Sequence, residues 1–366
     1  MRHFLFIFVL SFLFCAIGGA VGPKDTDPEK NFDALWESFN KRYAFFELRG
    51  VDWQSQYEKY RPKVTTETTD EELFAIFCAM LQPLKDAHVN LKAKGLKNGT
   101  FNPEQTPRFL EEFDSNKKLR QFQKLVQQTL LSEGFDTPEQ ANDILLYSHN
   151  GDYGYLLIKE FDGVSTTDLQ AGLNKAISAM DGIEGLIIDI RLNPGGTDKC
   201  VYQISERFTD KRRIGHHRKT KTGPGPNEFS ELKTRYLEPP EIGSRHPVFT
   251  GPITLLTHGA SYSAADVFAM LMADLPHVTI IGEPTHGIFS NMLERKLPNG
   301  WKYTLSHQVY YAADKTCYEG RGIPVDIEMQ NNWTDVELGT DPLIIKSLEV
   351  LANQPEPLLQ STTSSN

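Results

Sequence analysis

Apolar residues in the first third of the chain recur with the spacing of amphipathic helices. From residue 30 they stand at i, i+3, i+4 and i+7, which predicts a helix with one side packed on a core. Thr69 with Glu72 three residues later has the pattern of a capping box and predicts the start of a second helix. A further helical stretch runs through 119–130, and residues 88–93 alternate like a short strand. The first third is therefore predicted to be mostly helical.

The period changes after about residue 140, where apolar runs of strand length begin to alternate with helical stretches. The predicted strands are 144–147, 155–158, 185–190, 253–256 and 278–281, and the predicted helices are 167–180, 198–208, 264–275 and 341–352. Such βαβ alternation predicts a largely parallel sheet with helices on its faces. Residues 209–250 read as a long surface excursion, and 289–295 with 301–311 as a hairpin. We predict a mainly helical N-terminal region over 21–145, an α/β core over 146–350 and a disordered tail over 351–366.

Composition and charge narrow the class of protein. The chain has 366 residues, 39% of them hydrophobic, and a formal net charge of −10. That is enough apolar material for a sizeable core, and an acidic chain without Lys/Arg blocks is a poor nucleic-acid binder. The sequence carries no Walker or dinucleotide phosphate loop, no His-Glu-x-x-His helix and no paired-cysteine zinc site. We expect neither a cofactor nor a metal.

The N-terminus has the pattern of a secretory signal peptide over residues 1–20. Arg2 and His3 precede the apolar run 4–17, and Gly18-Gly19-Ala20 follows with small residues. This run is too short for a comfortable membrane span, although an uncleaved anchor is the alternative. The predicted location is periplasmic, cell-surface or extracellular, without stable membrane insertion after cleavage. The mature chain keeps three cysteines, and pairing of Cys200 with Cys317 stays open.

Three segments at strand-to-helix junctions carry unusual residues, and sites in open α/β sheets form at such junctions. The first contains Ser263 at the predicted start of the 264–275 helix, beside backbone N–H groups that are able to stabilise an oxyanion. The alternative is that Ser263 with Asp266 is a plain capping box. The second is the Gly195-Gly196 pair, which lets the backbone approach a substrate closely or makes an ordinary turn. The third contains His88, although His258 and His286 lie nearer to the serine in sequence.

Taken together, these segments resemble the tail-specific (C-terminal processing) serine protease family, most closely its tricorn-core-like branch. Five segments carry the resemblance in the order of the family, over residues 30 to 330. They are Asp86-Ala87-His88, Asp189 to Gly196 (Asp-x-Arg-x-Asn-x-Gly-Gly), Tyr262 to Asp266 (Tyr-Ser-Ala-Ala-Asp), Gly282 to Gly287 (Gly-Glu-x-Thr-x-Gly) and Tyr318 to Asp326 (Tyr-Glu-Gly-x-Gly-Ile-x-x-Asp).

The resemblance implies a serine endopeptidase with a crotonase/ClpP-like core that forms an acyl-enzyme intermediate. Ser263 would be the nucleophile, His88 the general base and Glu319 the acid that orients the histidine. The oxyanion donors would be the N–H groups of Ala264 and of Gly195 or Gly196. A Glu319 carboxylate near the imidazole would favour its charged form, so we expect the acid limb of activity above about pH 6.5.

The chain also departs from the family pattern. Ile288 stands where many relatives carry the lysine of a Ser-Lys dyad, Asp266 replaces a glutamate, and His258 replaces an asparagine. Residues 95–145 are predicted to be helical, so we expect no PDZ domain. The predicted partner is a peptide or unfolded protein substrate. A noncatalytic ligand- or peptide-binding protein on the same fold is the main alternative, and an acyl-CoA enzyme is a weaker one. The oligomeric state stays open.

Overall fold

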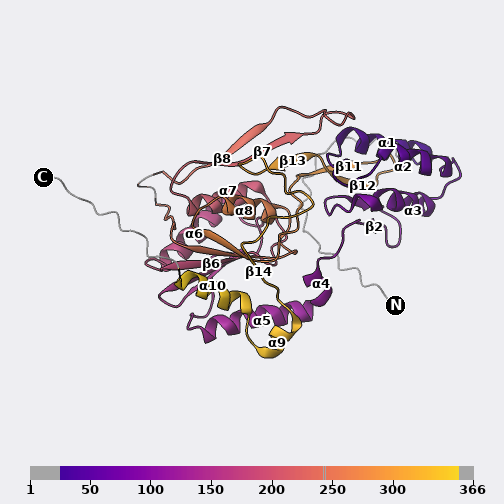
Figure 1. The fold of residues 1–366 in the computed structure, drawn as a ribbon. Coiled ribbons are helices and arrows are strands. Elements are labelled where there is room, and N and C mark those ends of the chain that lie inside the picture. The colour runs from indigo at the N-terminus through magenta and orange to yellow at the C-terminus, as the bar shows by residue number, and fades with distance from the viewer. Residues whose placement is uncertain (1–24, 242, 244, 354–366) are drawn as a thin grey trace. The chain divides into compact units, whose positions relative to one another are not determined.

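The computed structural model describes residues 25–353, except 242 and 244, and divides them into two compact units (Figure 1). The first unit contains residues 25–106, 214–235 and 287–322, and the second contains 107–213, 236–286 and 323–353. The predicted signal peptide and nearly all of the predicted tail lie outside the described residues.

Helices and a small antiparallel sheet make up most of the first unit. The helices are α1 (Pro28–Arg42), α2 (Trp53–Tyr60) and α3 (Asp70–Leu81), with the 3₁₀ turns η1 (Arg61–Lys63) and η2 (Gln82–Leu84). The sheet has the order β11-β12-β1-β2, with β1 (Asn90–Lys92), β2 (Thr100–Phe101), β11 (Met292–Lys296) and β12 (Lys302–Ser306). The capping box at Thr69 is formed, which confirms that prediction. Phe32, Leu35 and Phe39 share one core with Trp301 and Leu305, so the helices bury the apolar face of this sheet.

A second small sheet lies in the stretch that was predicted to be a surface excursion. Its order is β13-β7-β8, with β7 (Arg213–Thr220), β8 (Lys233–Leu237) and β13 (Gln308–Tyr311). The surface excursion predicted over 209–250 included no strands, because pairing with β13 supplies hydrogen bonds that the local composition does not signal. These strands belong mainly to the first unit, although they follow second-unit residues in the chain.

A seven-stranded sheet forms the centre of the second unit, in the order β14-β10-β9-β6-β5-β4-β3. Its strands from β14 to β5 are parallel, and β4 and β3 add antiparallel edges. The strands are β3 (Glu139–Gln140), β4 (Leu145–His149), β5 (Tyr153–Ile158), β6 (Gly185–Asp189), β9 (Ile253–Thr257), β10 (Val278–Gly282) and β14 (Ile327–Glu328). The predicted parallel α/β core is therefore confirmed.

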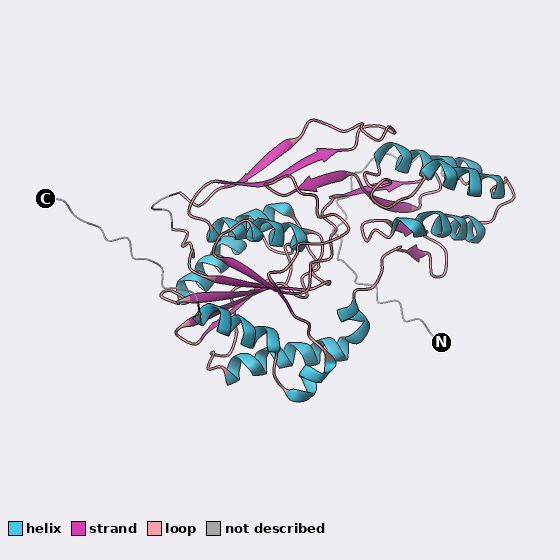
Figure 2. Ribbon diagram, viewed as in Figure 1, coloured by secondary structure: helices cyan, strands magenta, loops and turns pink. Residues whose placement is uncertain are grey.

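Helices cover both faces of this sheet (Figure 2). One face carries α6 (Thr166–Ala179), α7 (Asp198–Ser205), continued by η3 (Glu206–Phe208), and α8 (Ala264–Ala273). The other carries α5 (Asn116–Ser132) and α10 (Pro342–Ala352), accompanied by the short helices α4 (Arg108–Glu112) and α9 (Trp333–Leu338). Both faces of the central strands are therefore buried, which explains their continuous apolar sequence.

The division between the units differs from the boundary predicted near residue 145. The helix predicted through 119–130 is formed as α5. Its Leu130, however, packs in one core with Ile187, Leu343 and Leu351 of the second unit. The segment 287–322 returns to the first unit after most of the α/β core has been built. Secondary structure follows the local pattern, whereas unit membership follows from which apolar faces meet.

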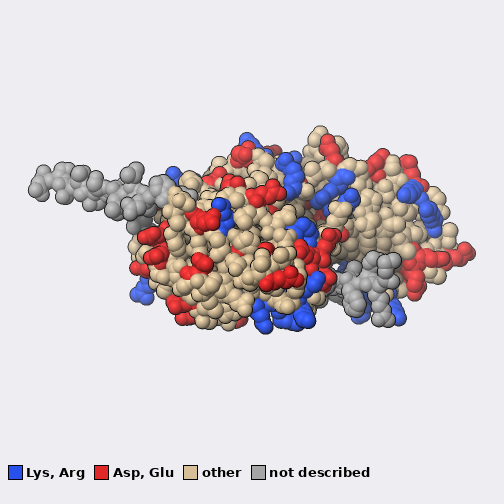
Figure 3. All heavy atoms as spheres, turned by 60° about the horizontal axis from the view of Figure 1, so that its bottom comes forward, with Lys and Arg blue, Asp and Glu red and all other residues tan. Residues whose placement is uncertain are grey.

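One further observation concerns the helices, and another concerns the charges on the surface. None of the helices in the described part of the chain is long and apolar enough to cross a bilayer. On the face drawn in Figure 3, acidic and basic side chains are interspersed.

Candidate active site

Ser263 stands in a strained backbone conformation immediately before α8. Its φ is +55° and its ψ is −111°, and it is one of four non-glycine residues with positive φ in the described chain. Such conformations cost about 1–3 kcal/mol and persist only where surrounding structure enforces them. The side chain is half-buried, at the junction where the chain leaves β9 for the helix. A strained serine at a strand-to-helix turn is a candidate nucleophile.

The capping-box interpretation of Ser263 and Asp266 is wrong. Ser263 occupies the N-cap position of α8, but its side chain makes no capping hydrogen bond. Its positive φ departs from the extended backbone typical of a capping serine. The serine is therefore held at this position for a reason other than helix capping.

The Gly195-Gly196 loop lies directly against the serine turn. The Tyr262 amide donates to the Asn193 carbonyl at 3.0 Å. A Cβ atom added to Gly195 would lie 2.8 Å from the Cβ of Ser263 and 2.7 Å from the carbonyl oxygen of Tyr262, so only glycine fits. The two loops follow the neighbouring parallel strands β6 and β9, whose carboxyl ends meet at one edge of the sheet.

The two glycine amides differ in what they are able to do. The N–H of Gly195 donates to Asn193 Oδ1 at 2.9 Å, and Gly195 is buried. Gly196 is exposed and forms a parallel bridge with Phe161, whose hydrogen bonds come from the amides of Phe161 and Thr197. The Gly196 N–H takes no part in that bridge. Ala264 is the first residue of α8, so its own N–H has no acceptor inside the helix.

The polar residues before the glycines form a buried framework. Arg191 Nη2 donates to Asp189 Oδ2 at 2.6 Å, and its Nη1 donates to Asp341 Oδ2 at 2.7 Å. Burial by itself would raise the pKa of the Asp189 carboxyl, but the adjacent guanidinium outweighs it and the pKa is lowered. Asn193 Nδ2 donates to the Ile158 carbonyl at 2.9 Å. The loop that contains the glycines is therefore attached by hydrogen bonds to β5 and to the start of α10.

His258 supports the serine turn from inside the second unit. Its ring stacks on Phe109 with centroids 4.1 Å apart, and its Nδ1 accepts the Ala260 amide at 3.2 Å. Burial, together with the Arg191 and Arg108 charges, holds the pKa of this imidazole well below its usual range. The ring is therefore neutral, and because Nδ1 accepts a hydrogen bond, its proton is on Nε2.

We expect His258→Ala to lower the unfolding free energy of the protein and to leave the pH dependence of catalysis largely unchanged. Losing the Ala260 contact and the stack should cost about 1–3 kcal/mol of unfolding free energy. His258→Asn, whose Oδ1 is able to replace Nδ1 as acceptor, should recover part of it. Thermal melts of the three proteins measure this. Equal destabilisation by both substitutions would show that the acceptor is not what stabilises the turn.

His286 supports the same turn from its other side. Its backbone N–H donates to the Ser261 carbonyl at 3.0 Å, and its ring lies on Tyr262 with centroids 4.3 Å apart. Its Nδ1 lies 3.1 Å from the Gly259 carbonyl, which is only able to accept, so this nitrogen carries a proton. Both histidines near Ser263 in sequence therefore hold the backbone of its turn.

His88 lies in the first unit, just before β1, and is 4% exposed. Its backbone N–H donates to Asp86 Oδ1 at 2.8 Å, and its carbonyl accepts from Thr304 Oγ1 at 2.7 Å. Tyr43, from the end of α1, donates its hydroxyl to Asp86 Oδ2 at 3.0 Å. This histidine is therefore fixed by a buried polar cluster rather than exposed on a loop.

The pKa of His88 moves opposite to the direction expected from the sequence. Burial lowers it, while the Asp86 carboxylate and a hydrogen bond with the Ser290 backbone oppose that change only in part. The expectation of an acid limb above about pH 6.5 is corrected accordingly. The sequence indicates a carboxylate that would favour the imidazolium, whereas the cost of burying that charge follows only from the fold.

Glu319 also belongs to the first unit and is 1% exposed. Its Oε2 accepts the Phe289 amide at 2.9 Å, and its Oε1 lies 3.7 Å from Arg49 Nη2. It is therefore an anchored buried carboxylate and not a solvated loop charge. Tyr43, Asp86 and Arg49 complete this cluster. The sequence singled out Asp86 only as part of its motif, and it singled out neither Tyr43 nor Arg49 as a site residue. Tyr43 gave no polar signal, because it fits the apolar face of α1.

The six residues singled out by the sequence fall into two groups. The second unit brings together Ser263, Ala264, Gly195 and Gly196, while the first unit holds His88 and Glu319. Cys78, Cys200 and Cys317 are free thiols, so the disulfide left open between Cys200 and Cys317 is not formed. Burial raises the pKa of the Cys200 thiol to about 12, which makes it unreactive at neutral pH.

Comparison with known proteins places the chain among peptidases. Residues 152–329 match peptidase family S41, and residues 24–82 match the tricorn protease C1 domain. A carboxy-terminal-processing protease of Bartonella bacilliformis is 27% identical over 197 residues, which cover 53% of this chain and 43% of that protein. The carboxy-terminal processing protease CtpB of Bacillus subtilis is 26% identical over 40% of this chain and 27% of its own. The chain thus spans less than half of the length of these curated relatives.

Solved structures agree with this placement. A candidate peptidase from Parabacteroides merdae is 28% identical, with a TM-score of 0.74 over 89% of this chain and 97% of its own. The tricorn protease shares the fold at 16% identity, with a TM-score of 0.53 over 89% of this chain and 36% of its own. The order of the five sequence segments, the S41 fold and both family matches lead to one conclusion. The chain belongs to peptidase family S41, the tail-specific (C-terminal processing) protease family, and is related to its tricorn-like branch.

Proposed function

We propose that this protein is an exported serine endopeptidase that hydrolyses peptide bonds of peptides or unfolded proteins through an acyl-enzyme. The observation that carries the proposal is the strained Ser263 at the start of α8, against which the Gly195-Gly196 loop packs. The names of the relatives support peptidase activity. Export rests on the pattern of residues 1–20, and the crotonase/ClpP-like class of the core rests on the resemblance.

The proposed reaction divides its roles between the two groups of residues. His88 takes the hydroxyl proton while Ser263 Oγ bonds to the substrate carbonyl carbon, and Glu319 orients the imidazole and stabilises its charged form. The amides of Gly196 and Ala264 hold the resulting oxyanion. His88 then protonates the leaving amine as the C–N bond breaks, and water hydrolyses the acyl-enzyme. Gly196 is preferred to Gly195 because the Gly195 amide already donates to Asn193.

A fluorophosphonate probe tests the proposal directly, because it phosphonylates activated serines. Wild-type protein should be labelled, and peptide mass mapping should place the label on Ser263. Absence of labelling in correctly folded protein would favour the noncatalytic binding alternative, and labelling elsewhere would refute the assigned nucleophile.

Gly195→Ala should abolish the close approach of the glycine loop to the serine turn. Its new Cβ would meet Ser263 Cβ at 2.8 Å, so the loop must move and misplace the adjacent oxyanion donor. We expect kcat to fall by about 10²–10³, as for loss of one such donor. Gly151→Ala is the matched control, because Gly151 has a similar φ of +97° but open space around its Cβ position. Steady-state kinetics and thermal melts of both variants decide it, and an unchanged kcat in Gly195→Ala would contradict the prediction.

A further inference from the structure

A cavity of about 550 Å³ lies within the first unit, between the β1–β2 loop and the β11–β12 turn. Three lysines line it, Lys92, Lys94 and Lys302, and none of the ten described residues that line it is acidic or aromatic. Gly95, Gly99 and Gly300 form other parts of its wall, where no side chain narrows the space. We call it the lysine cavity. It is strongly basic although the chain as a whole has a net charge of −10.

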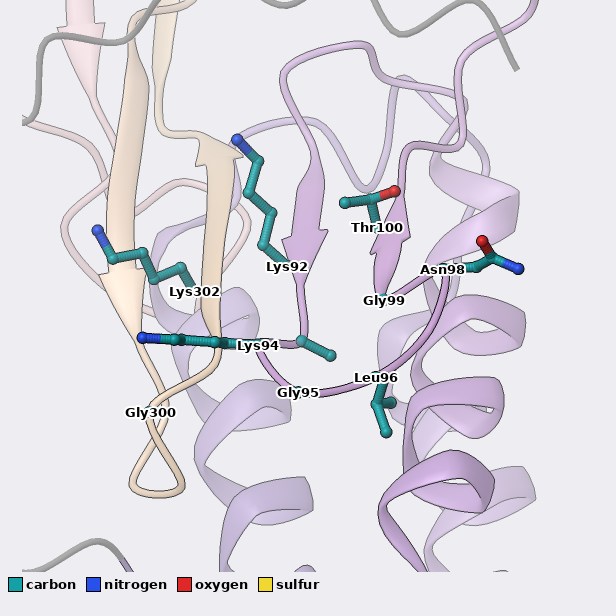
Figure 4. Close-up of a pocket in the computed structure, with 10 residues that line it drawn as sticks. Lys92, Lys94, Gly95, Leu96, Asn98, Gly99, Thr100, Gly300 and Lys302 are labelled. Atoms are coloured by element: carbon teal, nitrogen blue, oxygen red, sulfur yellow. The ribbon is translucent and has the colours of Figure 1, made fainter. Parts of the chain in front are cut away.

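The register of the sheet concentrates positive charge at this cavity. Lys92 on β1 stands directly opposite Lys302 on β12, which in turn stands opposite Lys296 on β11. Directly opposed residues of antiparallel strands share a face, and like charges placed so are unfavourable. Lys302 pairs with Glu294 at 3.1 Å, which offsets one of the charges. Figure 4 shows the side chains of Lys92, Lys94 and Lys302 extending toward the same side of the strands. An anion would be attracted to these ammonium groups.

The chemistry of the wall limits the kind of anion. Nucleobases are usually held by stacking on aromatic side chains, and the lining residues within the described part of the chain include none. Lysine ammonium groups bind carboxylates and phosphates alike, as mobile point charges. The proposed substrate is a polypeptide, and several separated ammonium groups fit carboxylates spaced along a flexible extended chain. An acidic polypeptide segment is therefore the anion expected here.

We propose that the lysine cavity binds Asp or Glu side chains of an acidic segment in a polypeptide substrate. This inference rests on the proposed function, since it gives the peptidase a preference for substrates that carry such a segment. Once the acidic segment is bound, the other peptide bonds of the same substrate chain are held at a raised effective concentration around the protein. Acidic proteins and peptides are then the preferred substrate class.

Binding is tested separately from cleavage, with the Ser263→Ala protein and fluorescence anisotropy. The probe is a C-terminally amidated peptide with a run of Glu, and its partner peptide has Gln in the same positions. Combined Lys92→Gln, Lys94→Gln and Lys302→Gln should weaken binding of the Glu peptide by about tenfold or more, and added salt should weaken it in the unsubstituted protein. The control combines Lys59→Gln, Lys63→Gln and Lys233→Gln, which removes equal charge from exposed lysines of the same unit outside the cavity.

The outcomes separate the possibilities. Equal affinity for the Glu and Gln peptides, or equal weakening by the control variant, would overturn the proposal. Competition by inorganic phosphate beyond the effect of matched ionic strength would reassign the cavity to phosphate and also overturn it. Thermal melts confirm that each variant is folded, which the exposure of Lys92 and Lys94 favours.

Cleavage is then measured with the active protein on a peptide joined to the Glu or Gln segment by spacers of increasing length. The triple cavity variant should raise KM for the Glu substrate by about tenfold, with kcat and the Gln substrate unchanged. Equal KM values for both substrates in the wild type, at every spacer length, would overturn the substrate preference. If neither substrate is hydrolysed, the proposed function fails, and the anisotropy experiment still decides whether the cavity binds acidic peptides.

Discussion

Ser263→Ala should abolish peptide hydrolysis, with kcat/KM reduced on the order of a thousandfold or more, because no other group replaces the nucleophile. The thermal midpoint should stay nearly unchanged. The Ser263 side chain makes no capping hydrogen bond, and alanine keeps the Cβ atom that the strained turn already accommodates. Hydrolysis of a quenched fluorescent peptide and thermal melts measure the two effects.

Two neighbouring substitutions make this prediction specific. Ser263→Gly should be equally inactive but more stable, by up to about 1–3 kcal/mol, because glycine adopts positive φ without strain. Ser261→Ala should lose stability rather than catalysis, since buried Ser261 Oγ donates to the Ile190 carbonyl at 2.8 Å. Full activity in Ser263→Ala with none in Ser261→Ala would refute the assigned nucleophile.

His88→Ala should also lose most of the turnover, about a thousandfold or more, because Ser263 would then lack its proton acceptor. In the proposed mechanism His88 must be neutral to accept the serine proton, so kcat/KM should fall on the acid side. Burial lowers the pKa of His88, so the midpoint of this acid limb should lie below about 6.5. A pH–rate profile of the wild type and the kcat/KM of the variant measure these two effects.

The same pKa shift has a consequence for stability. The folded pKa of His88 lies below its unfolded value, so between the two the unfolded chain binds more protons. Stability contributed by neutral His88 is therefore present above about pH 6.5 and is lost as the pH falls toward the folded pKa. His88→Ala should remove this part of the acid dependence, as pH-dependent thermal melts would show. An active His88→Ala together with an inactive His258→Ala would show that the base was assigned to the wrong histidine.

The local pattern of the sequence was enough for most elements and for the order of the site segments. Period-3.6 spacing predicted α1, α3, α5 and α8, and apolar runs bounded by polar turns predicted β5, β6, β9 and β10. These features depend on near neighbours, which the sequence displays directly. Short elements such as α4, β3 and β14 were not predicted, because two to five residues are too few to show a period of apolar positions. Ser263 and His88 were identified from their sequence segments, whereas Glu319 was identified from the resemblance alone.

Long-range packing decided what the sequence left open. It assigned α5 to the second unit and the 287–322 segment to the first, because each buries its apolar side against residues distant in the chain. It gave Ser263 a positive φ and no capping bond, and it distinguished the Gly196 amide from that of Gly195. It also reversed the expected pKa direction of His88, since desolvation depends on everything that surrounds the ring. Sequence spacing thus determined which groups are available, and only the folded environment determined their backbone strain, hydrogen-bond partners and charge.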